Sequence, residues 1–362
     1  MPRRRAARAR LGARWSGSRV PALTGRAGRG TVASVMTTPL GAYGANDPLF
    51  LLLAALIVEA YVGDVIARLP RVPHPRALLA RLTARLERRL NRPQRGRQAL
   101  VLRGLTVVLA LALAAAAIGW GLAALSRVYP FAWVVELFLL VALIGQHGAL
   151  RGLKAVADAL AAGGAERTRA ALRPMAGERL TPEQLEGLDL RGLSIAALDG
   201  GARRSVSAAF APVLFYVLLG LPGLMAQQAI WVVACVVANG NKPGGQGLGV
   251  GREGDFALAA VTLDAALVWV PDKVAGLLFA LAAAFVPGAH PLTALKRLSK
   301  AHAWSVGALG GALRLTGRKD GTLSRVGAPE ATQLKRAAML LGVALLIQGG
   351  LVAVLVLLRQ AT

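Results

Sequence analysis

Long apolar stretches constrain the fold of this chain more than any other feature of its sequence. The hydrocarbon core of a bilayer is about 30 Å thick, and a helix of about 20 residues crosses it. Runs of that length occupy residues 48–66, 101–125, 131–147, 208–238, 256–288 and 337–358. The chain is 55% hydrophobic with a mean hydropathy of +0.52, which is unusual for a soluble domain. The sequence therefore predicts an all-α, polytopic helical membrane protein with about five or six transmembrane segments.

The net charge of +25 points to a membrane surface rather than to nucleic acid. Arginines concentrate between the apolar runs, as the positive-inside rule expects of cytoplasmic loops, and they suit contact with anionic membrane lipid. Aromatic residues make up only 5% of the chain and do not interleave with basic stripes, so we expect no nucleic-acid partner. We predict a multi-pass protein of the bacterial inner (cytoplasmic) membrane. The single cysteine, Cys235, excludes an intrachain disulfide and a multi-cysteine zinc site.

Residues 1–35 are rich in arginine, and no acidic residue occurs before Asp47. Two interpretations stay open: a disordered extension, or a misassigned start with translation beginning at Met36. In either case we expect residues 36–362 to form the integral membrane domain.

Two regions between the apolar runs are expected to be cytoplasmic. Residues 76–92 are amphipathic at helical spacing and predict a helix in the headgroup plane, with its arginines on lipid phosphates. Its predicted apolar stripe is Leu78, Leu82, Leu86 and Leu90. Packing of this helix on another domain is the alternative. Residues 148–207 are polar, and within them Thr181 and Pro182 predict the start of a helix.

Prolines interrupt the apolar run at residues 208–238. Pro212 and the sequence Leu221-Pro222-Gly223 predict a kinked or re-entrant segment, which is tolerated only where protein or a cavity covers the freed backbone. Whether residues 208–238 and 256–288 each cross once or fold back is left open.

Candidate site residues gather at the end of the first apolar run. Glu59 lies inside that run, and an ionisable group there is a functional hypothesis by default. Gly63 and Asp64 follow, and then His74 lies between two prolines that hold it off any helix. An acid and an imidazole beyond a membrane segment form a candidate site, and a loop that merely leaves the bilayer is the alternative. Three further histidines stand alone near apolar ends and are interpreted as structural or interfacial: His147, His290 and His302.

These residues resemble the motifs of the CobD/CbiB family, the membrane-bound adenosylcobinamide-phosphate synthases of cobalamin biosynthesis. The resemblance covers roughly residues 48–320. Its opening turn and His-Pro pair are similar to Glu59, Gly63, Asp64, His74 and Pro75. Later family motifs are similar to segments that contain Pro212, Asp264, Pro271, Asp272, Lys273, Trp304 and Ser305.

The chain departs from the family pattern chiefly at polar residues. An acidic family motif is replaced by Arg203, Arg204, Ser207 and Ala208, and a family glutamate is replaced by Val306. Family lysine and asparagine positions fall on Gln228 and Trp231. The framework of apolar spacing, small residues and prolines is retained, while carboxylates that would hold magnesium are lost.

The resemblance implies an ATP-dependent amide-forming (C–N) ligase that joins adenosylcobyric acid to an aminopropanol phosphate. It implies ATP and Mg²⁺, no covalently bound cofactor, and a corrinoid and an aminopropanol phosphate as partners. The residues it assigns to catalysis are Asp64, His74, Asp264 and Lys273.

Two alternatives stay open. The loss of polar motif residues favours a catalytically degenerate paralogue, a membrane scaffold that binds an intact synthase or another cobalamin-pathway protein. The break near Pro222 and the intramembrane Glu59 favour a small-molecule membrane transporter.

Overall fold

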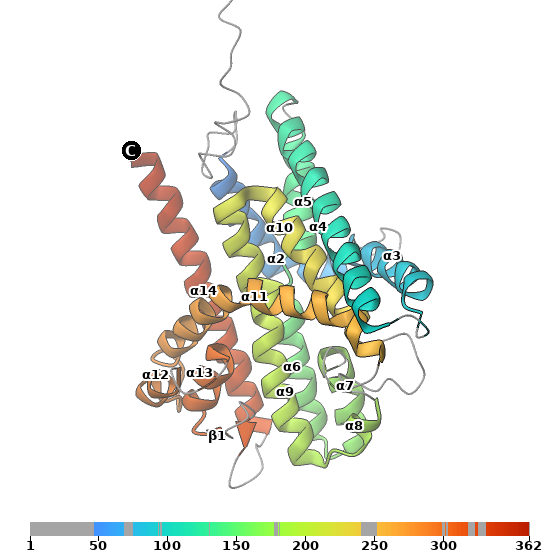
Figure 1. Ribbon diagram of the computed structural model, residues 1–362. Coiled ribbons are helices and arrows are strands. Elements are labelled where there is room, and N and C mark those ends of the chain that lie inside the picture. Colours follow the sequence, from blue (N-terminus) through green and yellow to red (C-terminus); the bar gives the residue numbers. More distant parts are fainter. Residues whose placement is uncertain are drawn as a thin grey trace, which may run out of the picture. The chain divides into compact units, whose positions relative to one another are not determined.

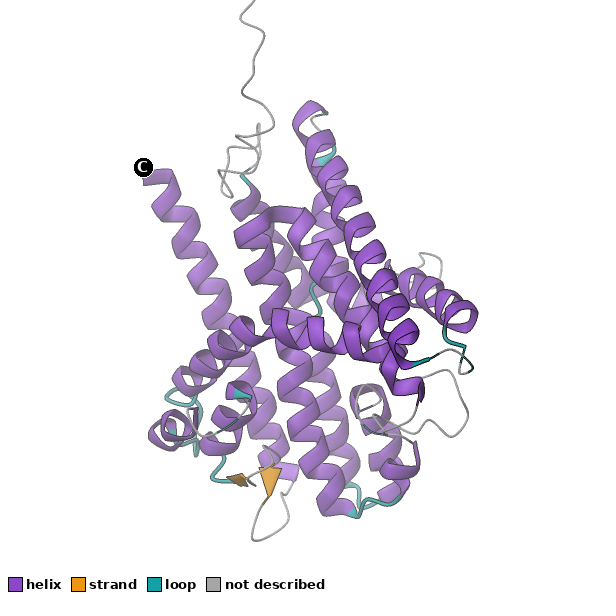
Figure 2. Cartoon of the chain, in the orientation of Figure 1, coloured by secondary structure: helices purple, strands orange, loops and turns teal. Residues whose placement is uncertain are grey.

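The computed structural model describes residues 47–68, 75–92, 94, 96–129, 131–176, 180, 182–239, 252–298, 301, 303–317, 323–324 and 331–361. Helices make up nearly all of this part of the chain (Figure 2). The first half holds α2 (Pro48–Arg68), α3 (Pro75–Leu90), α4 (Arg97–Val128), α5 (Trp133–Leu143), α6 (Gln146–Ala161), α7 (Ala165–Ala176) and α8 (Pro182–Glu186). The second half holds α9 (Leu190–Ser205), the π-helical turn η1 (Val206–Phe210), α10 (Ala211–Asn239), α11 (Arg252–Ala282), α12 (Pro291–Leu298), α13 (Trp304–Ala312) and α14 (Ala331–Ala361).

The predicted all-α membrane class is confirmed. Five helical stretches are long and apolar enough to cross a membrane: Arg97–Ser126, Trp133–Ala161, Leu190–Ala238, Gly254–Ala282 and Ala331–Gln360. A shorter apolar helix covers Pro48–Tyr61. The strands within the described residues are β1 (Thr316–Gly317) and β2 (Leu323–Ser324), a two-residue antiparallel pair.

α10 reverses direction within the apolar block, so this block folds back on itself. Gly220 has φ 67° and ψ −160°, a conformation that L side chains avoid, and Pro222 follows it. Beyond the break, Gln228 donates through Nε2 to the carbonyl of Ser207 at 3.2 Å, which brings the two ends of the block together. Figure 1 shows the two halves of α10 running in opposite directions. A kinked or re-entrant segment was predicted at Pro212 and Leu221-Pro222-Gly223, and the turn lies at Gly220, next to the second of these.

The returning half of α10 packs along α4. Leu100 and Val108 of α4 share one buried cluster with Val233 and Val237 of α10. Nearer the turn, a Cβ added at Gly119 of α4 would lie 2.9 Å from the Cα of Pro222. The two backbones therefore approach closely because a glycine stands at the crossing.

α11 lies across the other membrane helices rather than along them (Figure 1). It crosses α4 where a Cβ at Gly104 would meet the Phe256 carbonyl oxygen, so this contact also needs a glycine. Further along, Phe279 makes an edge-on ring contact with Phe210 of η1, with centroids 5.7 Å apart. Pro271 lies within α11 without ending it.

The predicted amphipathic helix exists as α3, and one of its sides packs on the protein. Leu78 and Leu82 are 50% and 45% exposed, whereas Leu79 packs on the core and Thr83 and Glu87 are buried. α3 turns its other side to α10, so Leu78 and Leu82 of the predicted stripe face away from the bundle, and the placement of this helix in the headgroup plane stays a prediction. The outward side carries both leucines and four exposed arginines: Arg81, Arg85, Arg88 and Arg89.

A second core joins the polar segment to the end of the chain. It is formed by α6, α7, α9, α13 and α14 and includes Leu153, Leu193, Leu309 and Leu341. α8 begins at Pro182 as predicted, while Thr181 lies outside the described residues.

Candidate functional site

Glu59 holds the first turn of α6. The start of a helix leaves backbone N–H groups without intrahelical partners, and an acidic side chain there also meets the positive end of the helix dipole. Glu59 accepts a hydrogen bond through Oε1 from the backbone N–H of His147, the second residue of α6, at 3.0 Å. Its other oxygen, Oε2, lies 3.9 Å from Nδ1 of the His147 ring. Glu59 is only 3% exposed, so this contact is inside the bundle.

Arg76 lies on the other side of the break between α5 and α6. It donates through Nη2 to the carbonyl of Leu143, where α5 ends, and through Nε to Gln228 Oε1 at 2.9 Å. Its guanidinium lies over the ring of Trp231, 5.0 Å from the centroid. A cation at the C-terminus of α5 and an anion at the N-terminus of α6 match the two helix dipoles.

The base of the α10 hairpin completes this cluster. Gln228 also donates to Gln227 Oε1 at 2.9 Å, and the backbone N–H of Gly145 donates to the Ala208 carbonyl at 2.8 Å. Gln227 and Gln228 are 1% and 2% exposed. One buried polar centre thus joins residues of α2, α3, the α5–α6 junction, η1 and α10. We name it the junction cluster: Glu59, Arg76, His147, Ser207, Gln228 and Trp231.

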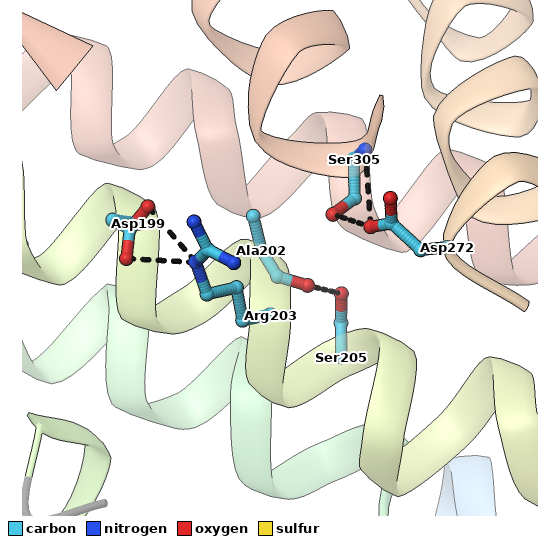
Figure 3. A network of polar contacts seen from close by, with 6 residues as sticks. All are labelled: Asp199, Ala202, Arg203, Ser205, Asp272 and Ser305. Atoms are coloured by element: carbon cyan, nitrogen blue, oxygen red, sulfur yellow. Dashed lines mark hydrogen bonds and ion pairs between the residues drawn. The ribbon is translucent and has the colours of Figure 1, made fainter. Parts of the chain in front are cut away.

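A second polar centre lies where α11 meets α13. Asp272 accepts hydrogen bonds from the backbone N–H of Ser305 at 3.3 Å and from the Ser305 hydroxyl (Figure 3). It also accepts one from the backbone N–H of Trp304 at 2.6 Å. Ala303, at the N-cap of α13, provides no side-chain cap. Asp272 therefore caps α13 from another helix. The neighbouring Lys273 places its ammonium between two rings, 4.1 Å from the Trp269 centroid and 4.3 Å from that of Trp304.

The arginine that replaces a family acid is paired with a carboxylate. Arg203 Nε lies 3.0 Å from Asp199 Oδ2, one turn earlier on α9 (Figure 3). Close by, the hydroxyl of Ser205 donates to the Ala202 carbonyl at 2.6 Å. Arg204 donates instead to the carbonyl of Pro174 on α7.

The residues assigned to catalysis by resemblance are not brought to one point in the described part of the chain. Asp264 and Lys273 are nine residues apart on α11, which places them on opposite faces and about 13 Å apart along the axis. His74 and the side chain of Asp64 lie outside the described residues, as does His302. Of the other motif positions, Gly63 lies in α2 and Pro75 begins α3, while Pro212 and Pro271 are buried.

The described residues do not assemble a metal site with three or more protein ligands. Mg²⁺ takes oxygen ligands, usually one or two carboxylates with water and phosphate oxygens. In the parts of the chain that the structure describes, no three His, Cys, Asp or Glu side chains gather closely enough to hold a metal ion. Asp199 and Asp272 are engaged by a cation and by a helix end, and Glu59 uses one of its two oxygens in the same way.

The sequence analysis missed Arg76 and took His147 for a structural histidine. The available signal for Arg76 was its position directly after the His-Pro pair, where a charged residue opens an amphipathic helix. Nothing local marked His147, because its partner Glu59 is 88 residues away.

Comparison with known proteins places these motifs in a family. The family model described as CobD/Cbib protein matches residues 52–329. This chain belongs to the CobD/Cbib family. The predicted family is therefore confirmed, and membership together with five apolar helices makes the chain a multi-pass membrane protein.

Curated relatives support the assignment over most of the chain. A Brucella anthropi protein named cobalamin biosynthesis protein CobD is 30% identical over 280 residues, which is 74% of this chain and 80% of the relative. A Rhodobacter capsulatus protein of the same name is 30% identical over 283 residues, covering 74% and 81%. A Brucella suis relative is 28% identical over 280 residues. No solved structure matches the chain.

Proposed function

We propose that this chain acts in cobalamin biosynthesis, in the bacterial inner membrane, at the step that joins adenosylcobyric acid to an aminopropanol phosphate. Two observations support the proposal. Relatives that match about three quarters of the chain are named cobalamin biosynthesis protein CobD. Within the fold, positions from three separate motif regions of the family converge in the junction cluster.

That convergence is the observation that carries the proposal. Glu59, Ser207, Gln228 and Trp231 come from distant parts of the sequence. Arg76 donates to Gln228 and lies over Trp231, Gln228 donates to the Ser207 carbonyl, and Glu59 accepts from the backbone of His147 at the start of α6. Buried polar networks of this kind are costly to assemble. A site that recognises a phosphorylated substrate uses such fixed cations, and Arg76 supplies one beside the acid Glu59.

ATP and Mg²⁺ belong to this proposal through the family resemblance. The described residues do not assemble a metal site with three or more protein ligands, so no catalytic step is assigned to the metal or to the nucleotide.

A catalytically degenerate paralogue is the second candidate. It is favoured by the pairing of Arg203 with Asp199 and by the use of Asp272 as a helix cap, since both place structural contacts where family chemistry would use polar groups. Such a chain would act as a membrane scaffold for an intact synthase or another cobalamin-pathway protein. The transporter hypothesis stays a prediction.

Genetic complementation separates the two candidates. The full chain would be expressed in a strain that lacks its own CobD/CbiB synthase, and growth that depends on cobalamin would be measured with cobyric acid as precursor. Cobinamide enters after the missing step and is the control. Growth on cobyric acid supports the synthase step. Growth on cobinamide alone, with the protein present in the membrane fraction, overturns it and favours the degenerate paralogue.

A further inference from the structure

A carboxylate oxygen and a ring nitrogen face each other inside the junction cluster at ion-pair distance, without a hydrogen bond between them. Glu59 Oε2 and His147 Nδ1 are 3.9 Å apart, too far for a hydrogen bond between them. Both atoms are buried, and neither has a hydrogen-bond partner within the described residues. A buried polar atom that is left without a partner is costly, and such atoms concentrate where function requires them.

The structural role of Glu59 does not account for this arrangement. Capping of α6 uses Oε1 alone, through the backbone N–H of His147. Oε2 and the imidazole ring take no part in the cap. They form a pair of groups from α2 and α6 that is held in place by the cap but not satisfied by it.

The geometry of the pair fits a single donor with more than one N–H bond. A nitrogen at the usual charge-assisted distance of about 2.8 Å from each atom can contact both across a 3.9 Å gap. Two of the three N–H bonds of a primary ammonium group can point at the two atoms together. The His147 side chain is 25% exposed against 4% for Glu59, so the histidine is the member of the pair nearer to the surface.

Charge around the pair indicates what else the donor carries. The positive charges of Arg76 and Arg151 act on the Glu59 carboxylate. They partly offset the cost of burying this carboxylate, and cations of this type also suit a phosphate attached to the donor. The fitting molecule is therefore a small zwitterion with a primary amine at one end and a phosphate at the other.

We propose that Glu59 and His147 form the subsite for the amine of an aminoalkyl phosphate. The carboxylate of Glu59 binds the ammonium group, and the imidazole of His147 accepts one of its protons at Nδ1. This inference rests on the proposed function, and it assigns the amine end of the substrate to residues of this chain.

The proton step balances without a further reactant. The substrate R–NH₃⁺ gives H⁺ to His147 Nδ1 and becomes R–NH₂, whose lone pair is then free to attack an activated carboxyl group. Imidazole suits this role because it takes up and releases protons near neutral pH. A charged amine has no lone pair to offer, so amide formation requires this transfer.

Binding measurements on the full chain in lipid nanodiscs test the subsite without turnover. The two probes are 1-amino-2-propanol phosphate and 1,2-propanediol phosphate, which differ in the amine alone. We expect the wild type to bind the amine probe at least about tenfold tighter, since a charge-assisted hydrogen bond contributes that much. We expect Glu59→Gln to reduce this preference to less than about threefold. Its amide oxygen can still accept from the His147 backbone N–H, so the cap is kept.

Glu136→Gln is the matched control. Glu136 is also 3% exposed, but it is fully engaged by the hydroxyls of Tyr216 at 2.8 Å and Ser126 at 3.1 Å. We expect this variant to keep the preference for the amine. A second variant, His147→Asn, should keep amine binding and, where turnover is present, lower kcat much more than it changes KM for the amine.

The outcomes separate this inference from the proposed function. Three results would overturn the subsite. The preference for the amine probe could survive in Glu59→Gln, it could be lost equally in Glu136→Gln, or it could be absent in the wild type. Preference that depends on Glu59 in a chain that fails to complement leaves the subsite standing and removes the synthase step. Complementation by both wild type and Glu59→Gln leaves the synthase step standing and removes the subsite.

Discussion

At the scale of single residues, two carboxylates hold the first turns of helices other than their own. Glu59 of α2 caps α6, and Asp272 of α11 caps α13. In both cases the capped helix lacks a capping side chain of its own, because Gly145 and Ala303 stand at the N-cap positions. Long-range capping of this kind joins elements that apolar packing alone leaves free to rotate.

Asp272→Asn should destabilise the protein by about 1–2 kcal/mol, because it weakens charge-assisted bonds to the start of α13. The measurement is the thermal unfolding midpoint in detergent micelles. Asp199→Asn is the comparison, since its pair with Arg203 lies on α9 one turn apart and is worth about 0.5 kcal/mol or less. Equal losses in the two variants would show that Asp272 is no more than a surface charge.

Arg76→Lys should reduce complementation at least about tenfold, because an ammonium cannot reproduce the forked contacts to Leu143 and Gln228 together with stacking on Trp231. Arg85→Lys, on the exposed side of α3, is the matched control and should be silent. The amount of each variant in the membrane would be measured by immunoblot. Normal growth with Arg76→Lys would remove Arg76 from the site.

At the scale of elements, the return of α10 along α4 depends on a glycine. Gly119→Ala should destabilise the protein by about 1–3 kcal/mol, because its Cβ would lie 2.9 Å from the Pro222 backbone. Gly121→Ala, on the same helix with open space around its Cβ position, should be neutral or slightly stabilising. The pair would be compared by thermal unfolding. Equal unfolding midpoints for the two variants would contradict the close contact between α4 and the turn of α10.

The exposed side of α3 is expected to bind anionic lipid. Arg81, Arg85, Arg88 and Arg89 lie on that side beside Leu78 and Leu82, and α3 connects two apolar helices that hold it near the bilayer surface. Replacing the four arginines by glutamine should reduce copurified phosphatidylglycerol several-fold, measured by mass spectrometry of bound lipids. Replacement by lysine keeps the charge and should keep the lipid. Equal lipid content in both variants would contradict an electrostatic attachment.

At the scale of the whole molecule, arginine content predicts the orientation in the membrane. The turn between α4 and α5 should lie on the opposite side of the bilayer from α3, because α4 is long enough to cross it. After Cys235→Ala, single cysteines at Tyr129 and at Arg88 would be labelled in intact cells with a membrane-impermeant maleimide. We expect labelling at position 129 and none at position 88 before lysis. The reverse pattern would invert the topology.

The apolar runs, the amphipathic α3 and the family were predictable from the sequence, because each is recorded as local periodicity, composition or motif spacing. The lengths of α4 and α14 follow from uninterrupted apolar residues, and the break in α10 follows from Gly220 and Pro222. The side of α3 that meets α10 was not predictable, since leucines on two sides of the helix gave no signal as to which side packs on the protein.

Tertiary structure alone decided the candidate site. Arg76 and Gln228 are 152 residues apart, Glu59 and His147 are 88 apart, and Asp272 and Ser305 are 33 apart. Hydropathy and spacing identify which segments enter the bundle, but they contain no information on which faces meet across it. That choice is made by close backbone approach at Gly104 and Gly119 and by the pairing of buried polar groups. The sequence by itself thus determined a basic, all-α membrane protein of the CobD/Cbib family, and only packing decided which acid meets which base.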